Sequence, residues 1–487
     1  MDAKEHEFEL TPIRVHSRPF VVKNILPPPK KMNRRSFLHT SAAATALAAF
    51  PFSLRAQPKS GGPRFRTALI GCGWWGNNIL REAMASGACE IVALCDVDSR
   101  QYEATLKNVA AGTGDTPKLF KDYRELLAAA KPEIVIVGTP DHWHALPMIA
   151  AVKAGAHVYV EKPIGHTVME GRAMVNAARA TGRVVQVGTH RRISPHNISG
   201  RDFIRSGQVG DIGMVRCFVN YGGGGPEKPL PTVAVPKELD WDMWCGPAPL
   251  RPFNGGDPRT PAVGAGNRGI HPRGFRNYLD YANGTLGDWG IHWLDQVLWV
   301  TGEKYPKRIF SSGGRPIAGA PVFTAQEQTT DAPDHQVATY AFEKFNVQWE
   351  HRRFGANNTD KGENVGCYFY GTKGIFHMGW QKGWTFYPGD SKAPPITEAA
   401  QLNSPDSQNI KELWADFLTA IRSDGKIKAV SDIGEVHLAS NMALLGMVSM
   451  KLGRSLDWDG ATERILNDEA ANKLLRRDYR KGYDYPT

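Results

Sequence analysis

The chain has 487 residues, enough for two or three domains that each bury a substantial core. Its 41% hydrophobic and 22% charged residues are typical of a globular protein and exclude a disordered, fibrous or membrane-embedded chain. The formal net charge is +10, but half of this excess lies in residues 1–56 and the remainder forms no basic run. The charge therefore does not indicate a nucleic-acid partner.

Residues 1–56 have the features of an export leader. Asn33-Arg34-Arg35-Ser36-Phe37-Leu38 is followed by a weakly apolar stretch, 41–54, and by a small residue, Ala56. A basic region, an apolar stretch too short to span a bilayer and a small residue before the cleavage point define a signal peptide. The leader resembles a twin-arginine (Tat) signal. It predicts translation from Met32, Tat-dependent export to the periplasm, cleavage after Ala56 and no membrane segment in the mature form. The alternative is an uncleaved tail or membrane anchor.

A regular alternation of apolar runs and helical stretches follows the leader. Residues 57–64, rich in Pro, Gly, Ser and Lys, are predicted to be a linker. The apolar runs lie at 67–70, 91–94, 134–137, 157–160 and 184–187. Short apolar strands separated by helices indicate a parallel, doubly wound sheet with its ligand crevice at the carboxyl ends of the strands. We therefore predict an α/β Rossmann domain over residues 65–190.

The pattern becomes β-rich over residues 191–487, which we predict to be a second domain for substrate binding and oligomerisation. Candidate strands lie at 214–221 and 334–342. Between them, residues 222–274 are rich in glycine and proline. A segment this long without periodicity is uncommon in a compact domain, so it predicts a loop over the substrate or a subunit contact.

Six cysteines, an even number, would suggest disulfides in an exported protein. However, Cys72 lies between two loop glycines, Cys95 lies in a predicted buried strand, and no two cysteines form a CxxC pair. We therefore expect mostly free, packed thiols, without a metal or redox role.

A glycine motif follows the first predicted strand. Gly71-Cys72-Gly73-Trp74-Trp75-Gly76 opens a helical stretch, and Asp96 ends the second strand 25 positions after Gly71. The first glycine permits a tight turn, the second admits the pyrophosphate, and the third allows close packing of the helix. Asp96 can bind the adenosine ribose and would repel a 2′-phosphate. The sequence therefore predicts bound NAD, although Arg100 leaves NADP as an alternative.

Two further motifs carry a family resemblance. Gly138-Thr139-Pro140-Asp141-His142-Trp143-His144 ends the third predicted strand, and Glu161-Lys162-Pro163 ends the next. From about residue 65 onward the chain resembles the Gfo/Idh/MocA family. The resemblance implies a Rossmann domain followed by an α+β domain with a large, open, mostly antiparallel sheet, and a homo-oligomer. It also implies cofactor contacts from Trp75 in the glycine loop and from Thr139, Pro140, His142, His144, Glu161 and Lys162.

The resemblance implies a reacting group made of Lys162, Asp288 and His292. Oxidation of a secondary alcohol requires a base for the hydroxyl proton, and an imidazole suits this role. We therefore expect His292 to be the base, with Lys162 stabilising the developing negative charge and Asp288 one helical turn away. The alternative is an ordinary surface pair of Asp288 and His292. Asp295, a turn further on, is expected to cap or brace the helix.

Other polar side chains have less defined roles. His190 and Arg191 follow the last Rossmann strand and are candidate substrate contacts. The segment 267–276, with His271, Arg273 and Arg276, is either a further set of polar contacts or surface charge. His142 and His144 resemble a metal-binding pair, but the sequence offers no third ligand, so no metal is predicted.

Three functions follow from these patterns. The first is an NAD-dependent oxidoreductase that transfers hydride between tightly bound NAD and a secondary hydroxyl of a sugar, polyol or glycoside. The second is an NAD-dependent glycoside hydrolase that works by transient oxidation, elimination and re-reduction, which export favours because a periplasm offers no evident pool to recycle NADH. The third is a non-catalytic carbohydrate-binding protein that kept the nucleotide.

Overall fold

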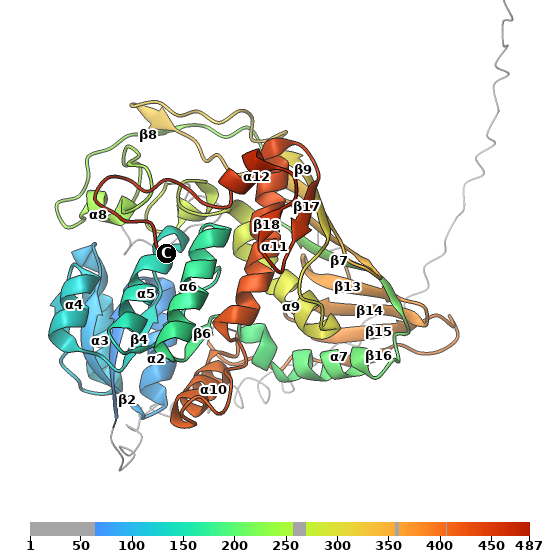
Figure 1. The fold of residues 1–487 in the computed structure, drawn as a ribbon, viewed down its shortest axis with the longest axis horizontal. Coiled ribbons are helices and arrows are strands. Elements are labelled where there is room, and N and C mark those ends of the chain that lie inside the picture. Colours follow the sequence, from blue (N-terminus) through green and yellow to red (C-terminus); the bar gives the residue numbers. More distant parts are fainter. Residues whose placement is uncertain (1–63, 257–268, 356–359, 406) are drawn as a thin grey trace, which may run out of the picture. The chain divides into compact units, whose positions relative to one another are not determined.

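The computed structural model describes residues 64–256, 269–355, 360–405 and 407–487. The predicted leader and almost all of the predicted linker lie outside these residues. The described chain contains two large sheets, one parallel and one mostly antiparallel, as the sequence predicts (Figure 1). In the described residues no helix is both long enough and apolar enough to cross a membrane.

The first sheet is the predicted Rossmann sheet. Its six parallel strands have the order β3-β2-β1-β4-β5-β6. They are β1 (Phe65–Ile70), β2 (Cys89–Cys95), β3 (Lys118–Phe120), β4 (Ile134–Val137), β5 (His157–Val160) and β6 (Val185–Val187). The helices between them are α2 (Trp74–Ala85), α3 (Tyr102–Gly112), α4 (Tyr123–Ala130), α5 (Ala145–Lys153) and α6 (Val168–Thr181), with short helical turns η1 (Ser99–Gln101) and η2 (Asp141–Trp143). The sequence did not predict β3, because this edge strand has only three residues and is not buried.

The second sheet has ten strands in the order β16-β15-β14-β13-β7-β12-β11-β9-β17-β18. All neighbours in it are antiparallel except β12 and β7, which are parallel. The strands are β7 (Ile212–Asn220), β9 (Arg308–Gly314), β11 (His335–Ala341), β12 (Asn346–Arg352), β13 (Val365–Gly371), β14 (Gly374–Gly379), β15 (Trp384–Pro388), β16 (Ile396–Glu398), β17 (Leu456–Asp459) and β18 (Arg464–Ile465). Strands β7 and β11 correspond to the predicted segments 214–221 and 334–342.

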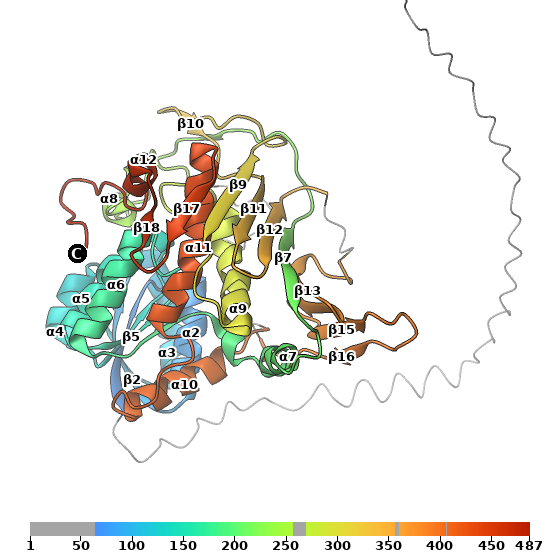
Figure 2. The same cartoon turned by 45° about the vertical axis from the view of Figure 1, so that its right-hand side comes forward.

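Helices join the two sheets into a common core. After β6 come η3 (His190–Ile193) and α7 (Pro195–Arg205), and later α9 (Ile291–Thr301), α10 (Ile410–Arg422), α11 (Ile433–Leu452) and α12 (Glu469–Lys473). Helix α11 contacts both α6 and β9, and lies between the two sheets in Figures 1 and 2. Helix α10 packs on α2, and its Trp414 and Phe417 share a buried cluster with Leu69 and Ile79. The first sheet is thus covered partly by a helix from the end of the chain.

The glycine- and proline-rich segment forms a separate small cluster beside the first sheet. It contains β8 (Leu230–Pro231), which pairs with β10 (Glu327–Gln328), and α8 (Trp241–Cys245). Trp241, Trp244 and Phe253 pack with Tyr278 and Tyr281 in a hydrophobic cluster. This cluster holds the described parts of the segment, 222–256 and 269–281, which we call the insert, although they contain little regular secondary structure.

All six cysteines are buried free thiols, as expected: Cys72, Cys89, Cys95, Cys217, Cys245 and Cys367. Burial in apolar surroundings raises the pKa of the Cys72, Cys95 and Cys367 thiols. These thiols therefore stay protonated and behave as small apolar side chains.

Candidate active site

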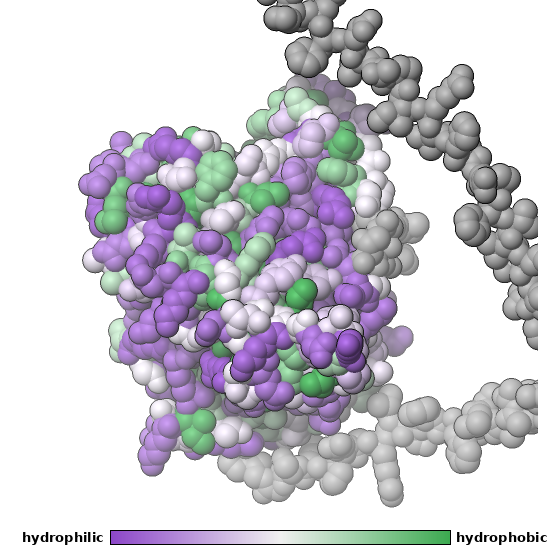
Figure 3. Space-filling model, turned by 90° about the vertical axis from the view of Figure 1, so that its right-hand side faces the viewer, coloured by the Kyte–Doolittle hydropathy of each residue, from purple (hydrophilic) through white to green (hydrophobic). Residues whose placement is uncertain are grey.

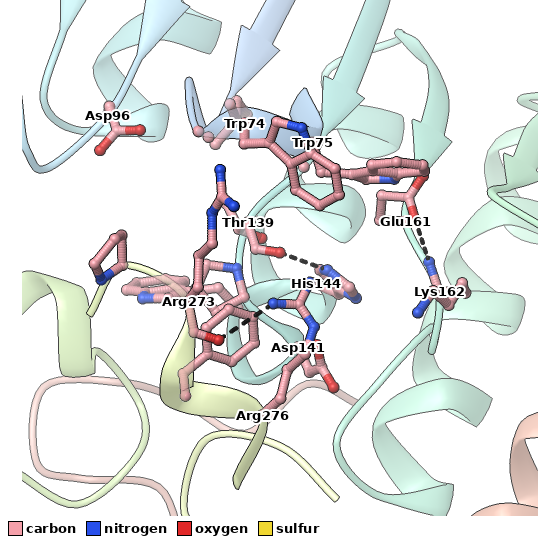
Figure 4. A pocket seen from close by; sticks show the side chains of 18 of the residues that line it. Trp74, Trp75, Asp96, Thr139, Asp141, His144, Glu161, Lys162, Arg273 and Arg276 are labelled. Carbon is pink, nitrogen blue, oxygen red and sulfur yellow. Dashed lines mark hydrogen bonds between the residues drawn. The ribbon is translucent and has the colours of Figure 1, made fainter. Parts of the chain in front are cut away.

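A pocket of about 330 Å³ lies at the carboxyl ends of β1, β2, β4 and β5 in the first sheet. This is where ligands bind in doubly wound sheets. Most of the predicted site residues line it: Gly71, Gly73, Trp75, Asp96, Thr139, Pro140, His144, Glu161, Lys162, His190, Asp288 and His292. The insert closes the opposite side with Met243, Trp244, His271, Pro272, Arg273, Phe275 and Arg276. Figure 4 shows the facing sets of side chains.

The glycine loop has the geometry that a dinucleotide requires. Gly71 has a positive φ of 94°, and a Cβ atom there would lie 2.7 Å from the carbonyl carbon of Gly138. A Cβ atom on Gly76 would lie 2.1 Å from the carbonyl oxygen of Gly71, so Gly76 allows helix α2 to approach. A Cβ atom on Gly73 would meet nothing within 4 Å. Gly73 therefore leaves open space at the uncapped N-terminus of α2, where a pyrophosphate can bind.

Asp96 and Asp98 define the adenosine end of the pocket. The Asp96 carboxylate accepts hydrogen bonds from the backbone N–H groups of Cys72 (2.7 Å) and Asp98 (2.9 Å), which fix it at the end of β2. Arg100, the residue that kept NADP as an alternative, binds both carboxylate oxygens of Asp98 at 2.7 Å. Arg100 is thus committed to Asp98, and a carboxylate faces the ribose site, which favours NAD.

One buried polar atom in the cofactor site has no hydrogen-bond partner within the described residues. It is Oγ1 of Thr139, whose side chain lines the pocket together with those of Trp75 and Glu161, which interact with each other. Buried polar groups normally have hydrogen-bond partners, so an unsatisfied one in a pocket points to a polar ligand. Together with the open space at Gly73, this atom supports the binding of a dinucleotide here.

Lys162 and Asp288 meet in this pocket. Nζ of Lys162 donates to Oδ1 of Asp288 at 2.7 Å and to the backbone oxygen of the same residue at 2.9 Å. Nε of Arg276 also donates to Oδ1 of Asp288, at 3.2 Å. Burial disfavours the charged carboxylate, but the two cations outweigh burial and lower the pKa of Asp288 to about 2. Asp288 is therefore an anion that holds Lys162 and Arg276 in position.

His292 lies beside this ion pair and is 6% exposed. Burial lowers its pKa well below the usual value, and the positive charges of Lys162 and Arg191 add to the shift. Its ring centroid is 5.3 Å from that of His190 and 5.1 Å from that of Trp380. His292 is thus a neutral imidazole at neutral pH, the form that can accept a proton.

The segment that carries Asp288 differs from the expectation. The sequence predicted one regular α-helical turn between Asp288 and His292, but Leu286–Gly290 is a π-helix (η6) and α9 begins only at Ile291. A π-helical turn is wider than an α-helical one and is frequent at functional sites. Both side chains line the pocket across this junction.

Three predicted residues do not line the pocket. Gly76 lies beneath the glycine loop, where it permits close packing. His142 is buried, and its Nε2 lies 2.9 Å from the carbonyl oxygen of Trp244, so it attaches η2 to the insert. Arg191 is 1% exposed, and its guanidinium stacks 3.6 Å from the ring centroid of Trp380, which itself lines the pocket.

His142 and His144, which resemble a metal-binding pair in the sequence, both contact backbone carbonyl oxygens instead. Both ring nitrogens of His144 lie within hydrogen-bond distance of carbonyl oxygens, those of Pro163 (2.6 Å) and Thr139 (2.8 Å). Over the described parts of the chain, no three His, Cys, Asp or Glu side chains form a group that could hold a metal.

Asp295, as expected, braces its helix: it forms a buried ion pair with Arg192 at 2.8 Å.

Sequence reasoning missed some pocket residues. Asp141, Trp289 and Trp380 line the pocket but were not singled out. Trp380 follows β14, about 220 positions after Lys162, and nothing in the local sequence marks it. Asp141 belongs to the motif Gly138–His144, and an acidic residue directly after Thr139-Pro140 could have marked it as a pocket residue. Arg276, which the sequence left undecided between polar contact and surface charge, binds Asp288.

Comparison with known families identifies the chain. A model described as "Oxidoreductase family, NAD-binding Rossmann fold" matches residues 65–189, and a model of the C-terminal α/β domain matches residues 220–310 and 330–485. The chain belongs to the Gfo/Idh/MocA family. This Gfo/Idh/MocA protein also matches the twin-arginine signal sequence over residues 31–51, as the leader predicts.

Curated relatives of this Gfo/Idh/MocA protein include dehydrogenases and a glycosidase. It is 30% identical over 152 residues to inositol 2-dehydrogenase of Salmonella paratyphi B, across 31% of this chain and 44% of that enzyme. It is 25% identical over 257 residues to the rhizopine catabolism protein MocA of Rhizobium meliloti (53% and 63%). It is 28% identical over 177 residues to a glycosyl hydrolase family 109 protein of Parabacteroides distasonis (35% and 38%). The aligned region thus spans about two-fifths to two-thirds of these relatives.

Solved structures share the fold. One is aldose-aldose oxidoreductase from Caulobacter crescentus complexed with glycerol, with a TM-score of 0.56 at 16% identity over 81% of this chain and 99% of that one. Another is the WlbA dehydrogenase from Bordetella pertussis in complex with NADH and UDP-GlcNAcA, with a TM-score of 0.54 at 18% identity over 81% and 99%. At these identities the likeness supports the architecture only.

Proposed function

We propose that this protein is an oxidoreductase that transfers hydride between NAD and a secondary hydroxyl group of a sugar, polyol or glycoside. One observation carries the proposal: Lys162, Asp288 and His292 line the same pocket as the dinucleotide cradle, and Lys162 and Asp288 form an ion pair there. The curated relatives that act on inositol support a polyhydroxylated substrate.

The chain's own groups have complementary roles in this reaction. Lys162 donates a hydrogen bond to the substrate oxygen, and Asp288 and the pocket wall keep its ammonium group in place. His292 is neutral and accepts the hydroxyl proton. NAD, when bound, supplies the hydride acceptor for the carbon that carries the hydroxyl group.

We infer that NAD stays bound between turnovers. A strap of the insert, Gly269–Asn277, contacts three parts of the site. His271 Nε2 lies 2.8 Å from Oδ2 of Asp98 at the adenosine end, and Arg273 stacks 4.8 Å from the ring centroid of Trp74 in the glycine loop. Arg276 binds Asp288 in the reacting group. Such a strap hinders cofactor exchange, which suits a protein exported with its cofactor.

The Tat signal supports a periplasmic location and transit through the Tat machinery. A homo-oligomer stays a prediction of the family resemblance. On the face shown in Figure 3, hydrophobic residues are scattered among hydrophilic ones.

A second candidate is redox-neutral hydrolysis of a glycoside. It is supported by the glycosyl hydrolase family 109 relatives and by Asp141, an additional acid in the same pocket. A non-catalytic carbohydrate-binding role is less well supported, because such a role needs neither Lys162 nor His292.

The first experiment is purification of the mature protein without added nucleotide, followed by denaturation and mass spectrometry of what is released. We expect near-stoichiometric NAD. A protein that is empty but later binds NAD would remove the argument for retention, and one that binds no nucleotide would overturn the proposed function.

A further inference from the structure

The pocket holds one acidic side chain that hydride transfer leaves unused. Asp141 begins η2, directly after Pro140 at the end of β4. It is 5% exposed and lines the pocket, and its buried Oδ2 has no hydrogen-bond partner among the described residues. A buried carboxyl group without a partner is costly, so its presence in a pocket points to a role toward the ligand.

The other three acids that line the pocket each have hydrogen-bond partners. Asp288 is bound by Lys162 and Arg276. The Asp96 carboxylate accepts the backbone N–H groups of Cys72 and Asp98, and the Glu161 carboxylate accepts the backbone N–H of Lys162 at 3.2 Å and a hydrogen bond from Trp75. Around Asp141, the charges of Arg276 and Lys162 favour its ionised form and the charge of Asp288 opposes it, and its own backbone N–H also stabilises the carboxylate. Figure 4 shows Asp141 together with Arg276, Lys162 and Glu161.

Both protonation states of Asp141 are accessible near neutral pH. Burial raises its pKa to about 7, against the lowering effect of Arg276. The acid form predominates below that pH and the carboxylate above it. A group balanced near neutrality is suited to accept a proton and return it.

We propose that Asp141 removes the proton from the carbon next to the carbonyl group that the oxidation creates. This inference rests on the proposed function. The ketone acidifies the neighbouring C–H bond; the proton passes to the Asp141 carboxylate, and the electron pair moves onto the ketone oxygen, where the Lys162 ammonium stabilises it. No additional oxidant or reductant is needed.

This step selects a class of substrate. If the next carbon carries a glycosidic oxygen, the electron pair forms a carbon–carbon double bond and expels that oxygen, which takes a proton from solvent. Asp141 would therefore allow the site to break glycosidic bonds, whereas His292 and Lys162 alone perform only the oxidation.

The test uses the purified holoprotein in D₂O with methyl α- and β-glycosides of glucose, galactose and N-acetylglucosamine. Absorbance at 340 nm reports reduction of bound NAD, and mass spectrometry reports deuterium on the carbon next to the oxidised one. Asp141→Asn has nearly the shape of the protonated acid but cannot accept the proton. We expect it to reduce deuterium exchange by roughly 100-fold or more, with the 340 nm amplitude within about twofold of wild type.

Glu161→Gln is the matched control, because it removes a second buried carboxylate from the same pocket. We expect this variant to exchange deuterium in proportion to the NADH that it forms. In wild type, deuterium exchange per NADH formed should fall as the pH drops through about 7, because protonation removes the accepting carboxylate. This profile tests the proposal even if Asp141→Asn folds poorly.

The outcomes separate the two proposals. No 340 nm signal from wild type with any of the glycosides would count against the proposed function itself. A signal without deuterium exchange, unchanged exchange in Asp141→Asn, or exchange that does not vary with pH would overturn the role of Asp141 alone.

Discussion

The two ends of the pocket are built in opposite ways. The dinucleotide cradle comes from one continuous stretch, from β1 to Asp96 directly after β2, and depends mainly on backbone: two glycines that allow close approach and a third that leaves open space. The reacting end depends on side chains from distant segments, with Lys162 after β5, Arg276 in the insert and Asp288 in the π-helix. The first is a local property of the chain, and the second exists only after folding. Substitutions at the two ends should therefore affect different properties: turnover at the reacting end, and nucleotide content or stability at the dinucleotide end.

The largest expected effect is at the reacting end. Lys162→Ala and His292→Ala each remove a group that we propose to act on the substrate oxygen or its proton, so we expect turnover to fall by roughly 10²–10⁴-fold. Released nucleotide, measured by mass spectrometry after denaturation, should stay near wild type in His292→Ala. Full activity in either variant would remove that residue from the reacting group.

The next largest effect concerns the buried ion pair that holds the helix of His292, where a substitution should lower the stability of the fold. Arg192 is 2% exposed and binds Asp295, which lies on the same helix as His292. Arg192→Met leaves the Asp295 carboxylate buried without its cation, and we expect a loss of about 3–5 kcal/mol in the free energy of unfolding. Urea denaturation measures it. Arg201→Met, at a half-exposed ion pair, is the control and should cost about 1 kcal/mol or less.

The dinucleotide end offers a matched pair of glycine variants. Gly76→Ala places a Cβ atom against the Gly71 backbone, so we expect about 1–3 kcal/mol of destabilisation. Gly73→Leu meets no protein atom near its Cβ but fills the space for the pyrophosphate, so it should lose bound nucleotide with little change in the unfolding midpoint of the nucleotide-free protein. Thermal unfolding and nucleotide content distinguish them. Equal behaviour of the two variants would contradict the assigned pyrophosphate position.

The smallest expected effect concerns the link between the ends. Asp288 has its pKa lowered to about 2, so its ionic contacts stabilise the fold above its ordinary pKa near 4 and are lost as the pH falls toward 2. Arg276→Gln removes one of the two cations and should raise this pKa. The variant should therefore lose thermal stability at a higher pH than wild type, when melting temperatures are compared between pH 2 and 5. Identical acid profiles would mean that Lys162 alone sets the charge of Asp288.

The accuracy of the sequence predictions follows the same division. Strands β1, β2, β4, β5 and β6 were predicted because each is a short apolar run that packs on both faces. The three-residue edge strand β3 carries no such signal, and the π-helical turn at Asp288 cannot be read from a helical pattern. Arg191 is a candidate substrate contact because of its place in the chain, but it does not line the pocket and stacks on Trp380, which follows β14.

The sequence by itself determined the dinucleotide cradle, because its turn, its open space and its acid lie within about 30 residues and follow local rules of backbone geometry. It also brought forward Lys162, Asp288 and His292 as the proposed reacting residues, through motifs that resemble those of a family. Only the tertiary structure decided which cations hold Asp288, that α10 packs on α2 beside the first sheet, and that Oδ2 of Asp141 has no hydrogen-bond partner among the described residues. Those outcomes depend on packing between segments far apart in the chain, which local sequence patterns do not reveal.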